Sequence, residues 1–134
     1  MKLLYALVCD QAFLSIDRKV NIIGVFETIN AAAFPVNHPK FTLVGSIAPS
    51  KEKFKMAIDI VSDEGNTSIL RDLQERDVVL PPNNEGKNFN FIIEILNTVF
   101  PKSGFYSVKI LLDGEAVSIL KLGLAQTEEV KKPN

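Results

Sequence analysis

The chain has 134 residues and carries 15 basic against 16 acidic side chains, which gives it a formal charge of −1 at neutral pH. Its 46% hydrophobic and 23% charged residues are typical of a globular domain and exclude an intrinsically disordered chain. A protein that binds nucleic acid through its phosphates needs an excess of basic residues, so we expect no nucleic-acid partner.

The N-terminal segment predicts a buried strand. The apolar run of residues 3–8 ends at Cys9, the single cysteine, and is shorter than the roughly 7–15 residues of a secretory signal. A lipoprotein signal is the alternative, but Val8 stands where a small residue would precede the cleavage site. Because no stretch approaches the ~20 apolar residues that cross a bilayer, we expect a cytoplasmic protein with no membrane partner.

Apolar side chains that alternate with a period of two predict strands in the first half of the chain. Residues 20–29 are apolar on both faces in their middle, which predicts a central strand whose second face is covered. Residues 41–48 form another apolar run, closed by Pro49. Residues 53–62 predict a strand with one buried face, made of Phe54, Met56, Ile58 and Ile60.

Three segments in the second half connect or continue these strands. Residues 63–66 predict a hairpin loop with a short return strand at about 67–71, and residues 72–77 predict a helical turn or a loop. Residues 81–86 contain two adjacent prolines and predict a loop. Residues 89–99 fit either a strand or a helical stripe, and their β-branched residues and asparagines favour the strand.

The dipeptide Asp113-Gly114 lies between two apolar runs and predicts a type I′ hairpin over residues 105–124. With these two residues as the loop, Leu112 faces Glu115, Ile110 faces Val117 and Val108 faces Ile119. On the other face this register predicts an apolar group on the outer surface, made of Phe105, Leu120 and Leu122.

Seven or eight short strands with little helix predict an all-β fold, an antiparallel two-sheet β-sandwich that is immunoglobulin-like or jelly-roll-like. We expect a single domain over residues 1–126, followed by a charged, disordered tail at residues 127–134. An α+β fold is the alternative if residues 89–99 are helical.

Several motifs together resemble a family of small uncharacterised prokaryotic proteins of unknown function. They are Cys9-Asp10, residues 21–26, Phe34-Pro35, His38-Pro39, residues 100–106 and Asp113-Gly114. The resemblance extends from about Tyr5 to Leu124 and implies no established activity. Separately, Gly104-Phe105-Tyr106 is similar to a strand entry of immunoglobulin-like domains, which implies that Tyr106 packs and bonds back at a sheet corner.

The residues that carry catalysis or hold metals are scarce. His38 is the single histidine, so a nucleophilic dyad would have to combine it with Cys9, and no nucleophile-elbow motif occurs. Asp59, Asp63 and Glu64 lack the spacing of a calcium loop, and no glycine-rich phosphate loop occurs. We therefore expect no catalytic residues, no metal and no cofactor.

The leading hypothesis is a non-catalytic binding or assembly module that contacts a protein partner or a second copy through Phe105, Leu120 and Leu122. The first alternative is a small-ligand or carbohydrate-binding domain that uses loops 34–40 and 81–88, with Asn37, His38 and Lys40 as binding residues. The second alternative is a small hydrolase.

Overall fold

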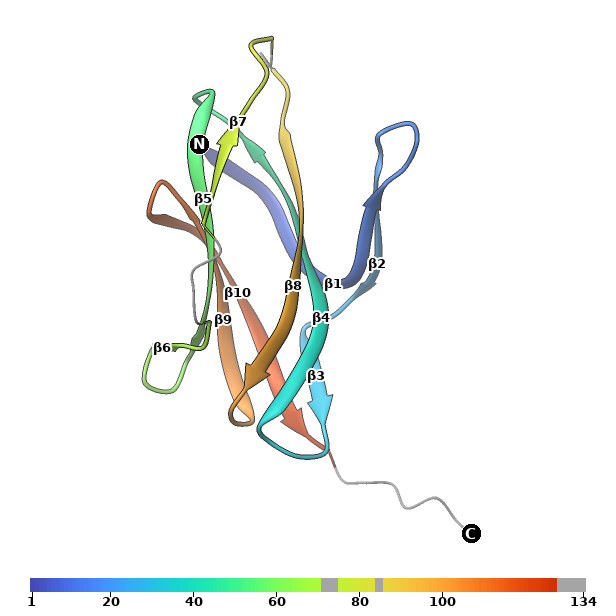
Figure 1. The fold of residues 1–134 in the computed structure, drawn as a ribbon, viewed down its shortest axis with the longest axis vertical. Helices are drawn as coiled ribbons and strands as arrows, with labels where there is room; N and C mark the ends of the chain where they lie inside the picture. The colour runs from blue at the N-terminus through green and yellow to red at the C-terminus, as the bar shows by residue number, and fades with distance from the viewer. Residues whose placement is uncertain (71–74, 84–85, 128–134) are drawn as a thin grey trace.

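The computed structural model of the chain describes residues 1–70, 75–83 and 86–127, and these residues form ten strands and no helix. Two mostly antiparallel sheets face each other (Figure 1), so the predicted all-β sandwich is confirmed with more strands than expected. In chain order the strands are β1 (Lys2–Leu14), β2 (Val20–Val25), β3 (Thr28–Ala31), β4 (Val36–Ala48), β5 (Lys53–Ser62), β6 (Thr67–Ser68), β7 (Arg76–Val79), β8 (Phe89–Phe100), β9 (Gly104–Leu112) and β10 (Glu115–Gln126).

The two sheets enclose one apolar core. The first sheet has the order β2-β1-β4-β8, and the second has the order β3-β10-β9-β5-β6, with β7 also paired to β5. β3 and β10 run parallel, whereas the other paired strands are antiparallel. The four residues predicted for the buried face of β5 lie in this core, together with Phe41, Leu43, Phe91, Ile93, Tyr106, Val108 and Ile110.

β8 is a strand throughout, so the helical alternative for residues 89–99 is wrong. Phe91, Ile93 and Ile95 are buried in the core at alternate positions, as a strand with one apolar face requires. Each of them pairs with a residue of β4, which is why two-residue alternation prevails over the helical stripe.

Residues 20–29 do not form one central strand. They divide at Phe26 and Glu27 into β2 and β3, which belong to different sheets, and β2 is the edge of the first sheet. The reason lies in β1, whose residues 2–9 pair with β4 while residues 9–14 pair with β2. The second half of β1 and β2 therefore form a hairpin, here called the β1–β2 arm (residues 10–25), which extends on the right-hand side of Figure 1.

The β9–β10 hairpin has the predicted turn but not the predicted register. Asp113 and Gly114 have φ values of +50° and +81°, as a type I′ turn requires, and Leu112 faces Glu115. An irregularity between Ala116 and Ser118 then shifts the pairing by one residue.

The shifted register moves the predicted outer-face group apart. Leu122 faces Tyr106 and is only 1% exposed, and Leu120 faces Val108 and packs against the core. Phe105 alone of the three lies outside, with 67% of its surface exposed. The prediction that these three residues share an outer face is therefore wrong, because a single bulge exchanges the two faces of a strand.

The connecting segments agree with the sequence only in part. Residues 76 and 77, predicted as a helical turn or a loop, begin the strand β7, because they pair with Met56 and Lys55 of β5. The return strand expected at 67–71 is confined, within the described residues, to Thr67 and Ser68. Residues 63–66 form a turn into the short strand β6, and residues 81–83 and 86 lie outside strands. The last residue of the expected return strand, residues 72–74 of the expected helical turn or loop, and residues 128–134 of the expected tail lie outside the described residues. No described segment is a helix long and apolar enough to cross a membrane.

Gly45 lets the core aromatic ring of Phe91 approach β4 closely. A Cβ atom at this position would lie 2.4 Å from Cζ of Phe91 and 2.6 Å from the backbone oxygen of Tyr5. We predict that Gly45→Ala lowers the free energy of unfolding by about 2 kcal/mol, because the overpacked centre has to shift backbone as well as side chain.

Urea denaturation of both variants checks this prediction. Gly123→Ala is the matched control, since its added Cβ would meet nothing closer than 3.4 Å. Equal losses of stability in the two variants would contradict the close contact at Gly45.

Candidate functional site

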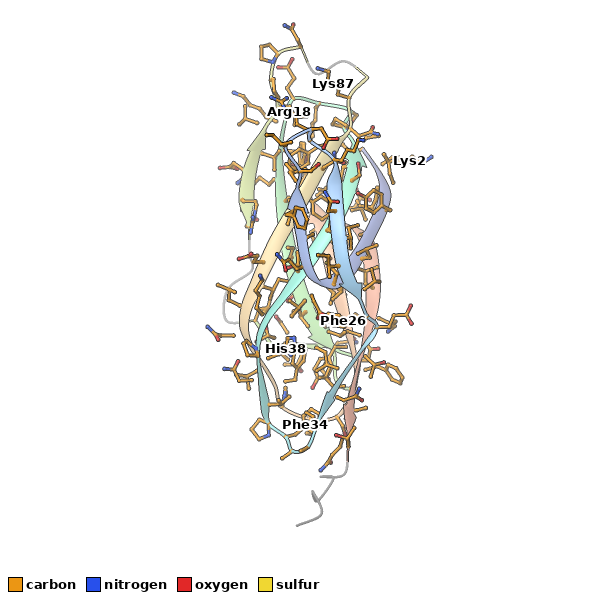
Figure 2. All side chains as sticks on the ribbon, turned by 90° about the vertical axis from the view of Figure 1, so that its right-hand side faces the viewer. Lys2, Arg18, Phe26, Phe34, His38 and Lys87 are labelled. Carbon is orange, nitrogen blue, oxygen red and sulfur yellow. The ribbon has the colours of Figure 1, made fainter. Side chains whose placement is uncertain are left out.

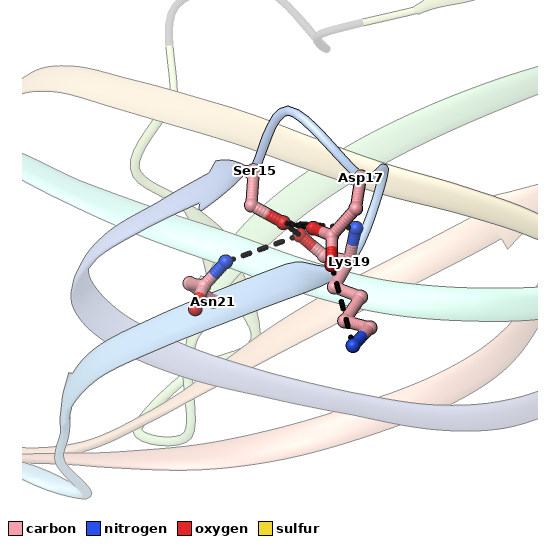
Figure 3. A network of polar contacts seen from close by, with 4 residues as sticks. All are labelled: Ser15, Asp17, Lys19 and Asn21. Carbon is pink, nitrogen blue, oxygen red and sulfur yellow. Dashed lines mark hydrogen bonds and ion pairs between the residues drawn. The ribbon is translucent and has the colours of Figure 1, made fainter.

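The turn at the tip of the β1–β2 arm is held by local polar contacts (Figure 3). The Ser15 hydroxyl donates to the carboxylate of Asp17 and accepts the backbone N–H of Lys19 at 3.1 Å. Asn21 donates to the carbonyl of Lys19 at 3.2 Å, and Lys19 forms an exposed ion pair with Asp17 at 3.2 Å. The Ser15 hydroxyl bond and Lys19 hold the pKa of Asp17 below its usual range. The tip therefore has a defined shape even though it lies in solvent.

The β1–β2 arm exposes apolar side chains that the rest of the described structure does not cover. On the face that carries the odd-numbered residues, Phe13, Ile23 and Val25 are exposed, Ile23 by 52% and Val25 by 59%. Leu14 and Ile16 add two more exposed apolar side chains at the outer end of the arm. Exposed apolar groups that gather on one element mark sites of interaction.

A shallow cavity of about 390 Å³ lies where the β1–β2 arm meets the sandwich. It is lined by Asp10, Gly24, Val25, Phe26, Thr28, Ile29, Asn30 and His38. Gly24 has a φ of +73°, and a Cβ there would lie 2.4 Å from the carboxylate of Asp10, so this position needs glycine for both conformation and space. The cavity brings the histidine together with a carboxylate and an amide.

The structure does not bring the three predicted binding residues together. Asn37, His38 and Lys40 lie within β4 and not in a loop, and the side chains of adjacent strand residues point to opposite faces. The His38 ring lies 6.4 Å from the ring of Phe26 and 5.9 Å from that of Phe41, whereas Lys40 pairs with Glu94 at 3.3 Å.

The two predicted binding loops also lie far apart. In Figure 2, Phe34 and Lys87 label opposite ends of the molecule, so loops 34–40 and 81–88 do not form a common site. The described part of the second loop lines its own cavity of about 300 Å³ with residues 48–52. The prediction of one site made from both loops is therefore wrong, because the strands that carry them run the length of the sandwich.

Cys9 is not placed as a nucleophile. Its side chain is fully buried where β1 pairs with both β4 and β2, and burial raises the pKa of its thiol. Its Sγ atom donates a weak hydrogen bond to the carbonyl of Gln11 at 3.4 Å. The neutral thiol is a poor nucleophile, so this position has the character of a packing residue.

A second polar cluster lies at the far side of the sandwich. Asp63 accepts hydrogen bonds from Lys121 Nζ at 2.5 Å and from the hydroxyl of Ser107 at 2.6 Å, and these bonds hold the pKa of Asp63 below its usual range. Across the described residues no group of three His, Cys, Asp or Glu side chains is placed to hold a metal ion. This cluster ties the loop after β5 to β9 and β10.

Next to this cluster lies the expected tyrosine contact. The Tyr106 hydroxyl donates to the carbonyl of Lys102 at 2.7 Å and accepts its N–H at 3.3 Å, which confirms that Tyr106 bonds back at the corner. Its ring packs edge-on against Phe100 at 5.1 Å. An open depression of about 590 Å³ beside it is lined by residues 62–64, Thr67, Ile69 and residues 101–106.

The residues that sequence reasoning missed are those of the β1–β2 arm. A signal for them was present, because residues 20–25 are apolar on both faces and such a pattern requires cover on both sides. The sequence did not show that β1 leaves β4 after Cys9 and pairs with β2 alone, and so it did not show that β2 lies at an edge.

Comparison with known proteins gives a family and no activity. The model of a family of unknown function, DUF6941, matches residues 4–125. None of the curated proteins matches the chain. Among solved structures, the Pseudomonas fluorescens alkylpurine DNA glycosylase AlkC bound to DNA containing an abasic site analog is similar with a TM-score of 0.45 and 15% identity, over 90% of this chain and 30% of the glycosylase. The chain thus spans less than a third of that protein's length, and we draw nothing about DNA binding from the likeness.

We predict that Cys9 resists alkylation in the folded protein. Iodoacetamide should modify it at least about 100-fold more slowly than in the urea-unfolded chain, because the buried thiol is both shielded and protonated. Intact mass spectrometry measures the two rates. Similar rates would show that the thiol is open to solvent.

The Asp63 cluster should make stability depend on pH. Because the folded-state pKa of Asp63 is lowered, its contribution is present at neutral pH and is lost as the pH falls below the ordinary aspartate value of about 4. We predict that Asp63→Asn lowers the free energy of unfolding by about 1 kcal/mol at pH 7, a value kept small by solvent screening. Below pH 4 the free energies of unfolding of the variant and of wild type should approach each other. Urea denaturation at pH 7 and pH 3 tests this, and a difference that stays constant would contradict it.

Proposed function

The chain belongs to the family of unknown function whose model it matches, and we propose that it is a non-catalytic module that binds another protein chain through its β1–β2 arm. The observation that carries this proposal is the exposure of Phe13 on β1 and of Ile23 and Val25 on β2. The apolar sequence of β2 is typical of a buried strand.

The energetics of the β1–β2 arm support a protein partner. Each of these three half-exposed side chains would contribute about 1 kcal/mol to association when a partner covers it. Ile16 adds an exposed apolar side chain at the tip, and Leu14 is exposed on the opposite, even-numbered face of the arm. The tip turn is already ordered by its hydrogen bonds, so little conformational entropy is lost there on binding.

The non-catalytic character is proposed from the chemistry of the candidate groups. His38 packs between two phenylalanine rings, and the Cys9 thiol is buried and protonated. The near-neutral charge of the chain supports a protein partner over a nucleic acid. A cytoplasmic location, a prokaryotic origin and an immunoglobulin-like character stay predictions.

A second candidate function is the binding of a small polar ligand at the base of the β1–β2 arm. It is favoured by the cavity of about 390 Å³, whose lining includes Asp10, Asn30 and His38. A thermal-shift response that is lost in His38→Ala would support this candidate.

We predict that Ile23→Lys abolishes protein binding by the β1–β2 arm without unfolding the chain. The matched control is Ile119→Lys, since Ile119 is 56% exposed against 52% for Ile23 but lies on β10 in the other sheet. Tagged wild type, Ile23→Lys and Ile119→Lys are compared by quantitative capture from an extract of the source cells.

The expected result is a set of proteins that wild type and Ile119→Lys retain and that Ile23→Lys loses by at least about 5-fold. This set includes untagged copies of the chain itself. Thermal unfolding should show similar melting temperatures for all three proteins. Identical capture by all three would contradict the proposed function.

A further inference from the structure

The open edge of β2 identifies a partner for the β1–β2 arm. We propose that this partner is a second copy of the chain, whose β2 lies antiparallel to the first β2 across a two-fold axis near Ile23. This inference rests on the proposed function of the arm and adds the identity and geometry of the partner.

The first argument is that the outer side of β2 is free to pair. β2 is hydrogen-bonded to β1 on one side, and no described strand pairs with its other side. Ser15 N–H donates to the carbonyl of Lys19 at 2.9 Å, so the alternation of an antiparallel ladder directs the backbone groups of Val20 and Ile22 to the open edge.

The second argument is that β2 lacks the features that protect an edge. Residues 20–25 contain no charged residue and no proline, both of which commonly prevent edge pairing. The other edge of the same sheet, β8, has Glu94 in its middle and Asn97 at a positive φ of +51°, which interrupts a regular ladder. Gly24 also has a positive φ, of +73°, so Val20 and Ile22 are the residues of β2 whose outward backbone groups keep regular strand geometry.

The third argument is that pairing would give β2 a neighbouring strand on both sides. A strand that is apolar on both faces is typical of the middle of a sheet. In the antiparallel pair, β2 of each copy becomes a central strand, and Ile23 and Val25 gain cross-strand neighbours from the same face of the other copy.

The fourth argument is charge complementarity, which favours a second copy over another protein. At the tip, Arg18 and Lys19 outnumber Asp17, whereas the inner end of the arm carries Asp10 and Glu27. An antiparallel pair places the basic tip of each copy beside the acidic inner end of the other, and a parallel pair would place like charges together. The same patch thus complements itself, as a two-fold interface requires.

Sedimentation velocity of the purified chain is the first test, between concentrations of about 10 µM and 1 mM. We expect a reversible dimer. Ile23→Lys should raise its dissociation constant at least about 10-fold, and Ile119→Lys should change this constant by less than about 2-fold. A wild type that stays monomeric over this range, or an Ile23→Lys variant that dimerises like wild type, overturns the proposal.

Charge exchange tests the antiparallel arrangement. Lys19→Glu and Glu27→Lys should each raise the dissociation constant of the dimer about 3- to 10-fold. The double variant should have a dissociation constant within about 3-fold of that of wild type. A double variant that is weaker than either single variant overturns the pairing of tip with inner end.

A spin label at Ile16→Cys tests the geometry directly, since Ile16 lies outside β2 and the buried Cys9 stays unlabelled. In the antiparallel dimer the two labels lie more than about 30 Å apart, because the tips of the arms point in opposite directions. A short distance between the labels indicates a parallel pair and overturns the proposal.

Failure of this inference is distinguishable from failure of the proposed function. A monomeric chain that still captures proteins through Ile23 overturns the two-fold pairing and leaves the arm as a binding surface for a different protein. If Ile23→Lys changes neither self-association nor capture, both proposals are overturned.

Discussion

Apolar side chains of β4 and β8 pack against those of β5 and β9 between the two sheets, and this contact positions every other element. Two edge-to-face aromatic pairs cross the gap, Phe54 with Phe89 at 5.9 Å and Phe100 with Tyr106 at 5.1 Å. Aromatic pairs of this geometry add stability beyond the area that they bury. Because they join opposite ends of β8 to the facing sheet, they hold the two sheets in one orientation.

The β1–β2 arm exists because only the first part of β1 pairs with β4. Residues 2–9 of β1 are held by β4, and Cys9 is the last residue that pairs with it. Beyond this point β1 diverges from β4, which continues to Val36 while still paired with β8, so among the described strands β2 is the only partner of residues 10–14. The apolar residues of the arm are thus excluded from the core by the direction in which β1 leaves β4 and not by their chemistry. A surface that is apolar for this reason is available to another chain.

Local features were predictable from the sequence, whereas the pairing of distant segments was not. The type I′ turn at Asp113-Gly114, the buried face of β5 and the corner contact of Tyr106 each depend on residues close in sequence. The shift at Ala116–Ser118 removed Leu122 from the predicted surface, because a bulge leaves no mark in an alternating pattern. His38 was singled out correctly as the lone histidine, yet its phenylalanine neighbours come partly from the distant Phe26.

The parallel pairing of β3 with β10 has a consequence for how the protein is made. Thr28 to Ala31 pair with Gly123 to Gln126, so the second sheet stays incomplete until residues 123–126 have left the ribosome. The β1–β2 hairpin needs only the first 25 residues and can form long before that. During synthesis the apolar residues of the β1–β2 arm are therefore exposed before the core can form, and exposure of this kind favours association with chaperones or with a neighbouring nascent copy.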